Sequence, residues 1–372
     1  MSLLVWKLRR SLIGGVAAVF FCAMPGSAVA QDAPTLRVID DTERGELVLE
    51  LGPVDLPAGA SHHEIAQPRG HIAELPIDGW LRGYSYEVVD GDGKPVPNHV
   101  LHHLNLIAPD RRELFSPIMM RIGAAGHETK PIKLPRLLGL RVRPGERIMV
   151  TAIFHNPTSE SYSRVYLRTR MPYTRADTWL KPWSVYPFYM DVMPPASIHA
   201  YDLPPGRSEK SWEGRPAISG RILGLGGHLH KYGVVLRLED VTEGKVVWEA
   251  RPELDEEGNV VGMPTKKFFL RFGRPGLRIH ADHLYRLTAV YDNPTGETIP
   301  EGAMGTLGGV FIPDDGQEWP ALDREHPEFA LDWKLSTEGA PPPEGGAAGQ
   351  GGHAGHGGHG AHGGTHGGGH HH

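Results

Sequence analysis

The sequence predicts an all-β protein built from β-sandwiches, and three observations support this fold class. From Asp32 to about Trp333, short runs rich in β-branched and aromatic residues are separated about every eight to twelve residues by Gly, Pro, Asn or Asp. The 372 residues include 48 glycines and 33 prolines, an excess that favours many turns and short strands. No segment of convincing length has the periodicity of an amphipathic helix. Evenly spaced short strands of this kind are typical of sandwiches.

Eight segments carry the strand pattern most clearly. They are residues 46–51, 80–89, 100–107, 147–154, 165–170, 234–239, 267–272 and 285–291. The chain is 40% hydrophobic, which is enough to bury proper cores. Its length suggests about two domains.

An internal repeat supports two domains of similar fold. The sequence TAIFHNPTSE at 151–160 recurs as TAVYDNPTGE at 288–297, with six identities and two conservative changes. Duplication of a sandwich is the simplest cause, and a coincidence of turn chemistry is the alternative. We expect an N-terminal domain at 31–172 and a C-terminal domain at 173–338, with the boundary in a stretch rich in Pro, Trp and Tyr.

The first thirty residues have the pattern of an export signal. A cationic stretch at 7–10 precedes an apolar run at 12–24 and the sequence AVA at 28–30, which predicts cleavage near Ala30. The single cysteine, Cys22, leaves with this segment, so we expect no disulfides and no thiolate metal sites. No other stretch approaches the length of a membrane span. We therefore expect a soluble periplasmic or secreted protein, exported by either the general or the twin-arginine pathway.

The net charge and the composition of the C-terminal segment limit the kinds of binding partner that we expect. A formal net charge of -6, with no basic cluster in the body, argues against nucleic-acid binding. Residues 339–372 are rich in Gly and His with almost no apolar side chain, which predicts a disordered tail. Spaced imidazoles on such a tail can bind Cu, Ni or Zn with little selectivity. A merely solubilising tail is the alternative.

Histidine is the compositional outlier, with 22 residues, of which eight lie in the last twenty positions. The strongest local signal in the body is the sequence GGHLHKYG at 226–233. Residues i and i+2 of a strand share a face, so His228 and His230 can converge on one ion. An ordinary polar edge is the alternative reading of such a pair.

A second histidine pair, His102 and His103, lies in a predicted strand. Adjacent strand residues point to opposite faces, so a shared metal requires a bulge or a strand end. A single buried histidine with a hydrogen bond is the alternative. Another candidate ligand, His155, ends the first copy of the repeated strand. Its counterpart in the second copy is Asp292, so the two copies cannot carry identical sites.

Met304, in the sequence EGAMGTL, is the remaining candidate ligand. A methionine usually packs in a core. Beside two imidazoles, however, a thioether is a soft ligand that favours Cu(I) over zinc. The residue types therefore point to redox chemistry.

In chain order, His-His, a strand ending in His-Asn-Pro, His-x-His and Met-Gly-x-Leu resemble the motifs of the copper type II, ascorbate-dependent monooxygenases. That family includes the peptidylglycine α-hydroxylating and dopamine β-monooxygenases and bacterial relatives. The resemblance covers about residues 70–313 and includes the sequences KLP at 133–135 and GLR at 139–141. It implies two jelly-roll domains, each binding one copper, that face each other across a solvent-filled cleft.

Carried over by motif, the resemblance implies two unlike copper sites. An electron-storing copper would be bound by His102, His103 and His155, and an oxygen-activating copper by His228, His230 and Met304. Ascorbate or another reductant would reduce both ions, and O2 would be used to hydroxylate a C–H bond of a small substrate. The peptide-hydroxylating enzyme has an arginine two residues before His-x-His, whereas this chain has Gly226. Peptidylglycine is therefore not the expected substrate.

The sequence leads to three alternative hypotheses about the function of the chain. The first is an exported copper-dependent monooxygenase. The second is a periplasmic copper-binding or copper-handling protein on the same fold, and the third is a metal-free sandwich that binds a carbohydrate or a partner. The remaining body histidines have no predicted role except that His280 and His283 are expected near the second copper. The others are His62, His63, His71, His99, His127, His199 and His326.

Overall fold

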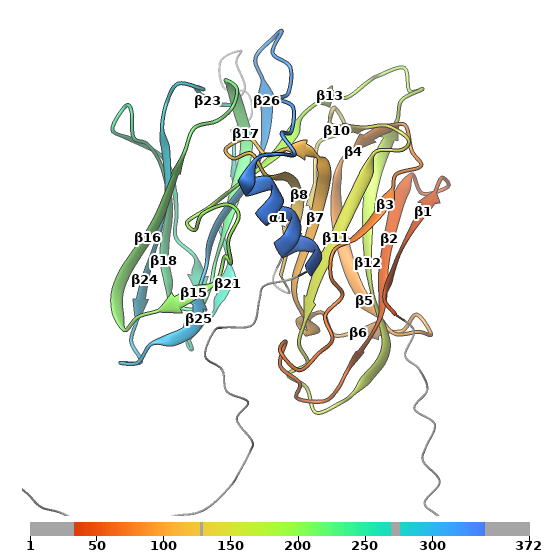
Figure 1. The fold of residues 1–372 in the computed structure, drawn as a ribbon, viewed down its shortest axis with the longest axis vertical. Helices are drawn as coiled ribbons and strands as arrows, with labels where there is room; N and C mark the ends of the chain where they lie inside the picture. Colours follow the sequence, from red (N-terminus) through yellow and green to blue (C-terminus); the bar gives the residue numbers. More distant parts are fainter. Residues whose placement is uncertain (1–32, 127–128, 269–275, 339–372) are drawn as a thin grey trace, which may run out of the picture. The chain divides into compact units, whose positions relative to one another are not determined.

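The computed structural model describes residues 33–126, 129–268 and 276–338, in which β-strands make up nearly all of the regular structure (Figure 1). The predicted all-β fold class is confirmed. The export signal with Cys22, the residue His127 and the Gly/His-rich tail lie outside the described residues. Within the described part of the chain, no helix is long and apolar enough to cross a membrane.

The first half of the chain forms two sheets. Its strands are β1 (Thr35–Asp41), β2 (Glu46–Leu56), β3 (His71–Glu74), β4 (Gly79–Leu81), β5 (Gly83–Val89), β6 (Pro95–Val96), β7 (Leu101–Arg112), β8 (Met119–Ala125), β9 (Ile132–Lys133), β10 (Leu138–Val142), β11 (Arg147–Phe154), β12 (Tyr162–Arg175) and β13 (Trp183–Ser184). One sheet has the order β1-β2-β12-β4-β10-β13, with β5 pairing β12, β6 and β9, and the other has the order β3-β11-β7-β8. A 3-10 turn, η1 (Asn98–Val100), leads directly into β7.

The second half forms sheets of its own. Its strands are β14 (Tyr186–Asp191), β15 (Tyr201–Leu203), β16 (Gly206–Gly214), β17 (Gly220–Leu229), β18 (Gly233–Asp240), β19 (Lys245–Ala250), β20 (Glu253–Leu254), β21 (Val260–Gly262), β22 (Lys266–Lys267), β23 (Leu277–Ile279), β24 (Tyr285–Asn293), β25 (Ile299–Ala303) and β26 (Gly305–Pro313). One sheet has the order β14-β26-β17-β22, with β23 also pairing β17, and another has the order β16-β24-β18-β19. Two short pairs, β15-β25 and β20-β21, complete this half.

The two halves repeat one strand order. In the first half β2-β12-β5-β9 accompanies β3-β11-β7-β8, and in the second half β14-β26-β17-β23 accompanies β16-β24-β18-β19. Two four-stranded sheets in this order form a jelly roll, in which Greek-key connections carry the chain from sheet to sheet. The chain therefore consists of two tandem jelly rolls, a first made of β1–β13 and a second made of β14–β26.

The repeated Asn-Pro turns make the same hydrogen bonds in both jelly rolls. Asn156 and Asn293 are buried, at 0% and 1% exposed, and each amide nitrogen donates to three backbone carbonyls. Each Oδ1 also accepts from the backbone N–H of the threonine two residues later, at 3.1 Å in both copies. The three carbonyls belong to Leu56, Pro57 and Glu160 in the first copy and to Leu203, Pro204 and Glu297 in the second. Matching bonds at matching positions favour duplication over coincidence.

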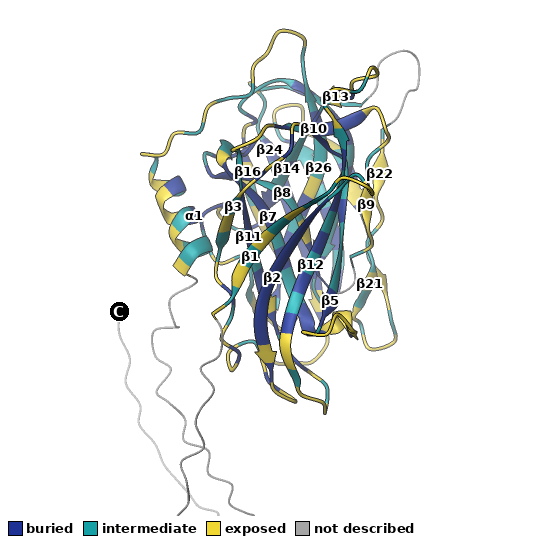
Figure 2. Ribbon diagram, turned by 90° about the vertical axis from the view of Figure 1, so that its right-hand side faces the viewer, coloured by how far each residue is buried: buried dark blue, intermediate teal, exposed yellow. Residues whose placement is uncertain are grey.

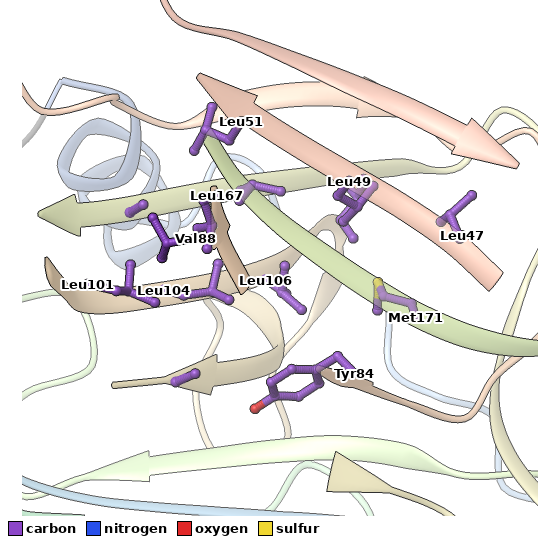
Figure 3. Packing of buried hydrophobic residues seen from close by; sticks show 14 of the residues in the cluster. Leu47, Leu49, Leu51, Tyr84, Val88, Leu101, Leu104, Leu106, Leu167 and Met171 are labelled. Carbon is purple, nitrogen blue, oxygen red and sulfur yellow. The ribbon is translucent and has the colours of Figure 1, made fainter. Parts of the chain in front are cut away.

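The core of the first jelly roll lies between its two sheets. Figure 2 shows β2 as a largely buried strand, and Figure 3 shows side chains of β2 and β12 meeting those of β7. The labelled residues from these strands are Leu47, Leu49, Leu51, Leu101, Leu104, Leu106, Leu167 and Met171. Burial over most of its length explains why β2 is mostly apolar, whereas β12 faces the core with alternate residues only.

A loop of the first jelly roll enters the core of the second. Leu114 and Phe115, in the connection between β7 and β8, are 0% and 4% exposed within the second core. The Phe115 ring lies 5.9 Å from that of Phe188 and 6.1 Å from that of Tyr285, measured between centroids. Burial of these two side chains therefore contributes to holding the two jelly rolls together.

The change from one jelly roll to the other falls later than the boundary expected at residue 172. β12 runs through that position to Arg175, and β13 still pairs with β10 of the first jelly roll. The first strand of the second jelly roll, β14, begins at Tyr186. Strand pairing with a distant partner decides this boundary, so the composition of the stretch did not reveal it.

One helix, α1 (Pro327–Glu338), was missed from the sequence. Its Phe329 packs in a cluster with Met119 and Met149 of the first jelly roll. Its other buried residue is a carboxylate, Asp332, paired with Arg121 at 2.5 Å. Because a charged residue occupies the buried face, the apolar periodicity that predicts a helix is weak here.

Candidate metal centre

The first predicted ligand set, His102, His103 and His155, begins at a β-bulge. Ile153 pairs with His103, but the next residue of β11, Phe154, pairs with Leu101. His102 is thus the extra residue of the bulge, and its ring centroid lies 4.2 Å from that of His103. The bulge supplies the irregularity that two adjacent strand histidines need to face one ion.

The third member of this set, His155, lies directly after β11. Its ring centroid is 5.3 Å from that of His102, and its Nε2 lies 2.6 Å from the carbonyl oxygen of His99. A carbonyl can only accept, so Nε2 is the donor of this bond, and in a neutral ring Nδ1 would be the atom that binds a metal. Such a hydrogen bond to the second ring nitrogen is the usual way to orient a histidine ligand.

The second predicted set, His228, His230 and Met304, is built at the end of β17. The rings of His228 and His230 lie 5.1 Å apart between centroids, while the intervening Leu229 is 1% exposed. The two histidines therefore share a strand face, as expected. A Cβ at Gly227 would lie 2.3 Å from the side chain of Leu236, so only glycine fits there.

Tyr291 joins two members of the second set. Its hydroxyl accepts from the backbone N–H of His230 at 2.9 Å and from that of Met304 at 3.0 Å, and it donates to the Met304 carbonyl. Tyr291 is 1% exposed, and burial raises the pKa of its hydroxyl above the usual range. The equivalent residue of the first copy is Phe154, which has no hydroxyl. This Phe-to-Tyr difference between the two copies of the repeat is the sequence signal for Tyr291.

The two sets form one continuous group of imidazoles. Ring centroids are 5.9 Å apart for His103 and His228, 6.1 Å for His103 and His230, and 6.4 Å for His102 and His230. Aromatic rings at these separations are in contact. The expectation that the sets face each other across a solvent-filled cleft is therefore wrong. Insertion of the β7–β8 loop into the second core brings the jelly rolls together.

The chemistry of the sets suits a metal. Burial, and then the neighbouring imidazoles, hold the pKa of His103 well below its usual value, which favours the neutral form that binds metals. A metal about 2 Å from a ring nitrogen lies about 3 Å from the ring centroid, so rings sharing an ion have centroids within about 6 Å. The pairs within each set whose separations are given above meet this condition.

In two other groups of residues, the atoms that could bind a metal lie closer together than in the first ligand set. Among the described residues, His62, His63 and Glu301 have ligand atoms all within 4.8 Å, and so do His280, Asp282 and His283. The first set is not such a group, so its imidazoles must rotate to share an ion. The adjacent histidines at 62–63 are the sequence signal for the first of these groups.

The expectation that His280 and His283 lie near the second set is wrong. The His280 N–H donates to the hydroxyl of Tyr285, at the start of β24, whereas His230 bonds Tyr291 near its end. Six residues of extended strand separate these tyrosines by about 20 Å. His283 instead pairs with a carboxylate of β18, Asp240, at 2.7 Å, which raises the pKa of His283.

Comparison with known proteins does not assign the chain to a family. No protein-family model and no curated protein matches the chain. Among solved structures, similarity is found to the STIV MCP, at 8% identity over 76% of this chain and 96% of that one, with a TM-score of 0.35. PNGF-II is similar at 7% identity over 78% and 63%, with a TM-score of 0.30. Likenesses of this size say nothing about what the chain does.

Proposed function

We propose that the chain is an exported copper-dependent monooxygenase, which hydroxylates a C–H bond of a small substrate with O2 and a reductant such as ascorbate. The observation that carries this proposal is the contact between two unlike ligand sets. One offers three imidazoles and the other two imidazoles with Met304, whose backbone is tied to that of His230 through Tyr291, and the nearest ring centroids of the two sets are 5.9 Å apart. Two metal sites that touch, one with only imidazole ligands and one with a softer thioether ligand, suit electron storage at the first and oxygen activation at the second.

Divergence of the duplicated strand supports unlike sites. At the matching positions the first copy has Phe154 and His155, and the second has Tyr291 and Asp292. The first copy thereby gains an imidazole, while the second gains the hydroxyl that ties His230 to Met304. A duplicated scaffold has thus been altered at adjacent positions to create two different donor sets.

The residues of the chain would hold and orient the metal rather than react. Copper bound at the sets would supply one-electron chemistry and O2 activation. The His99 carbonyl fixes the tautomer of His155, and the Tyr291 hydroxyl fixes the backbone on both sides of the second set. The partly buried position of these imidazoles limits water at the centre.

A copper-binding or copper-handling role is the second candidate. It is favoured by the unbroken contact between imidazoles of the two sets, along which an ion can move by exchange between neighbouring ligands. The eight histidines of the last twenty residues add capacity. This role requires no substrate and no consumption of O2.

The test uses the full chain with the eight tail histidines replaced by serine, so that only the body binds copper. The monooxygenase proposal expects two spectroscopically different Cu(II) sites and O2 consumption that needs both ascorbate and a substrate from a broad panel. Met304→Leu, which removes the sulfur but keeps the volume, should abolish turnover. Met263→Leu is the matched control and should remain active. Copper binding without substrate-dependent O2 consumption would favour the handling role.

A further inference from the structure

The loop that carries His62 and His63 is fastened to the strand that leads to His155. The side-chain amide of Gln67 donates to the carbonyl oxygens of His62 and Phe154, both at 2.8 Å, and accepts from the Phe154 N–H at 2.7 Å. The backbone around His62 is therefore held beside the first ligand set.

A carboxylate from the second jelly roll reaches the same place. Glu301, in β25, has φ +50° and donates its N–H to Asp202 at 3.0 Å. In the first jelly roll, Arg164 has φ +52° and donates its N–H to Asp55 at 2.7 Å. The duplicated turn fixes the backbone in both cases. Because arginine serves equally well in one copy, the fold does not require the carboxylate of Glu301.

The three side chains have the spacing of a metal site. Their ligand atoms all lie within 4.8 Å, and Nε2 of His62 is 3.8 Å from Oε2 of Glu301. That separation is too long for a hydrogen bond. Two atoms bound to one zinc ion lie about 3.3 Å apart, so only a small side-chain movement is needed. The rings of His62 and His63 are already 3.8 Å apart between centroids.

We propose that His62, His63 and Glu301 form a third metal site, which binds a divalent ion, Zn(II) or Cu(II), between the two jelly rolls. Two imidazoles and a carboxylate without sulfur do not favour Cu(I), in contrast to the set that includes Met304. The ring of His62 stacks on that of His102 at 5.7 Å and 17°. The third site thus adjoins the first ligand set and lies nearer solvent, since His63 and Glu301 are exposed.

The experiment measures Zn(II) binding by calorimetry in the full chain with the tail histidines replaced by serine. Glu301→Gln should bind one ion fewer than this parent, or bind it at least about 100-fold more weakly. Arg164→Gln, the equivalent position of the first copy, is the matched control and should bind Zn(II) like the parent. His63→Ala should repeat the effect of Glu301→Gln. Equal Zn(II) binding by Glu301→Gln and the parent would overturn the site.

A second experiment, with copper in place of zinc, compares the third site with the second ligand set. It also tests the third site independently of the monooxygenase proposal. Cu(II) at the third site should be released when ascorbate is added without O2, while copper at the second set is retained. Retention of all the copper by the parent would contradict the assignment. Because Glu301 is outside both ligand sets, O2 consumption should survive Glu301→Gln. If the third site binds Zn(II) as expected but the parent consumes no O2, the result would contradict the monooxygenase proposal and leave the third site supported.

Discussion

The ring of His103 lies 5.9 Å from that of His228, edge to face, although the two residues belong to different jelly rolls. No strand pairing among the described residues links the two jelly rolls. Their contact instead involves the β7–β8 loop, which places Phe115 in the second core, and an apolar cluster that joins Leu138 to Leu223. Changes in this loop should therefore alter the distance between the ligand sets.

Glu113, at the start of that loop, should make stability depend on pH. It is 0% exposed, and burial raises its pKa to about 7, although the backbone N–H groups of Arg121, Leu114 and Tyr189 favour the carboxylate. A folded-state pKa above the unfolded value of 4.5 means that the stabilisation is full below pH 4.5 and is lost as the pH rises through 7. The loss is roughly 3 kcal/mol.

Urea unfolding of metal-free protein between pH 4.5 and 8 measures this loss. Glu113→Gln cannot ionise, so its stability should change less over this range than that of the parent. Glu74→Gln, at an exposed site, should follow the parent. Identical pH dependence in the parent and Glu113→Gln would show that the carboxyl does not carry the effect.

Removal of one hydroxyl should damage only the second ligand set. Tyr291→Phe leaves the backbone groups of His230 and Met304 without their partner, which should cost about 1–3 kcal/mol of stability. Copper affinity of the second set should fall, while the first set is unchanged in electron paramagnetic resonance spectra. Tyr285→Phe, which removes a hydroxyl at the other end of β24, is the control. Equal copper loss in both variants would contradict the role of Tyr291.

The two repeated asparagines should separate folding from ligand placement. Asn156→Ala and Asn293→Ala each remove a buried amide that donates to three carbonyls, so each should lose at least about 2 kcal/mol. Only Asn156 adjoins a predicted ligand, His155. Copper at the first set should therefore weaken in Asn156→Ala alone. Calorimetric unfolding and copper titration of both variants test this, and equal copper loss would contradict it.

The buried charge on α1 should anchor the helix. Asp332→Ala leaves Arg121, whose side chain is 10% exposed, without its partner, which should cost about 3–5 kcal/mol. Hydrogen exchange in α1 should rise in the same variant. Asp177→Ala, which breaks the exposed pair with Arg175, should leave stability almost unchanged. Unchanged exchange in Asp332→Ala would mean that the other contacts of the helix, such as those of Phe329 and Trp333, hold it without the ion pair.

Local features of the fold were predictable from sequence. The repeated turns around Asn156 and Asn293 were found because an asparagine side chain satisfies backbone groups close along the chain. The need for a bulge at His102 followed from the alternation of strand side chains. Helix α1 was not predicted, because Asp332 occupies its buried face, where the hydrophobic periodicity of an amphipathic helix requires an apolar residue.

The sequence by itself determined that the protein is a duplicated all-β chain whose copies carry unlike donor residues. Strand alternation and turn chemistry act over a few residues, so they can be recognised in the sequence. Only the tertiary structure decided that the first and second ligand sets touch, that Tyr291 ties His230 to Met304, and that Glu301 lies beside His62. These contacts join distant segments, and burial of Leu114 and Phe115 in the second core brings the two jelly rolls together.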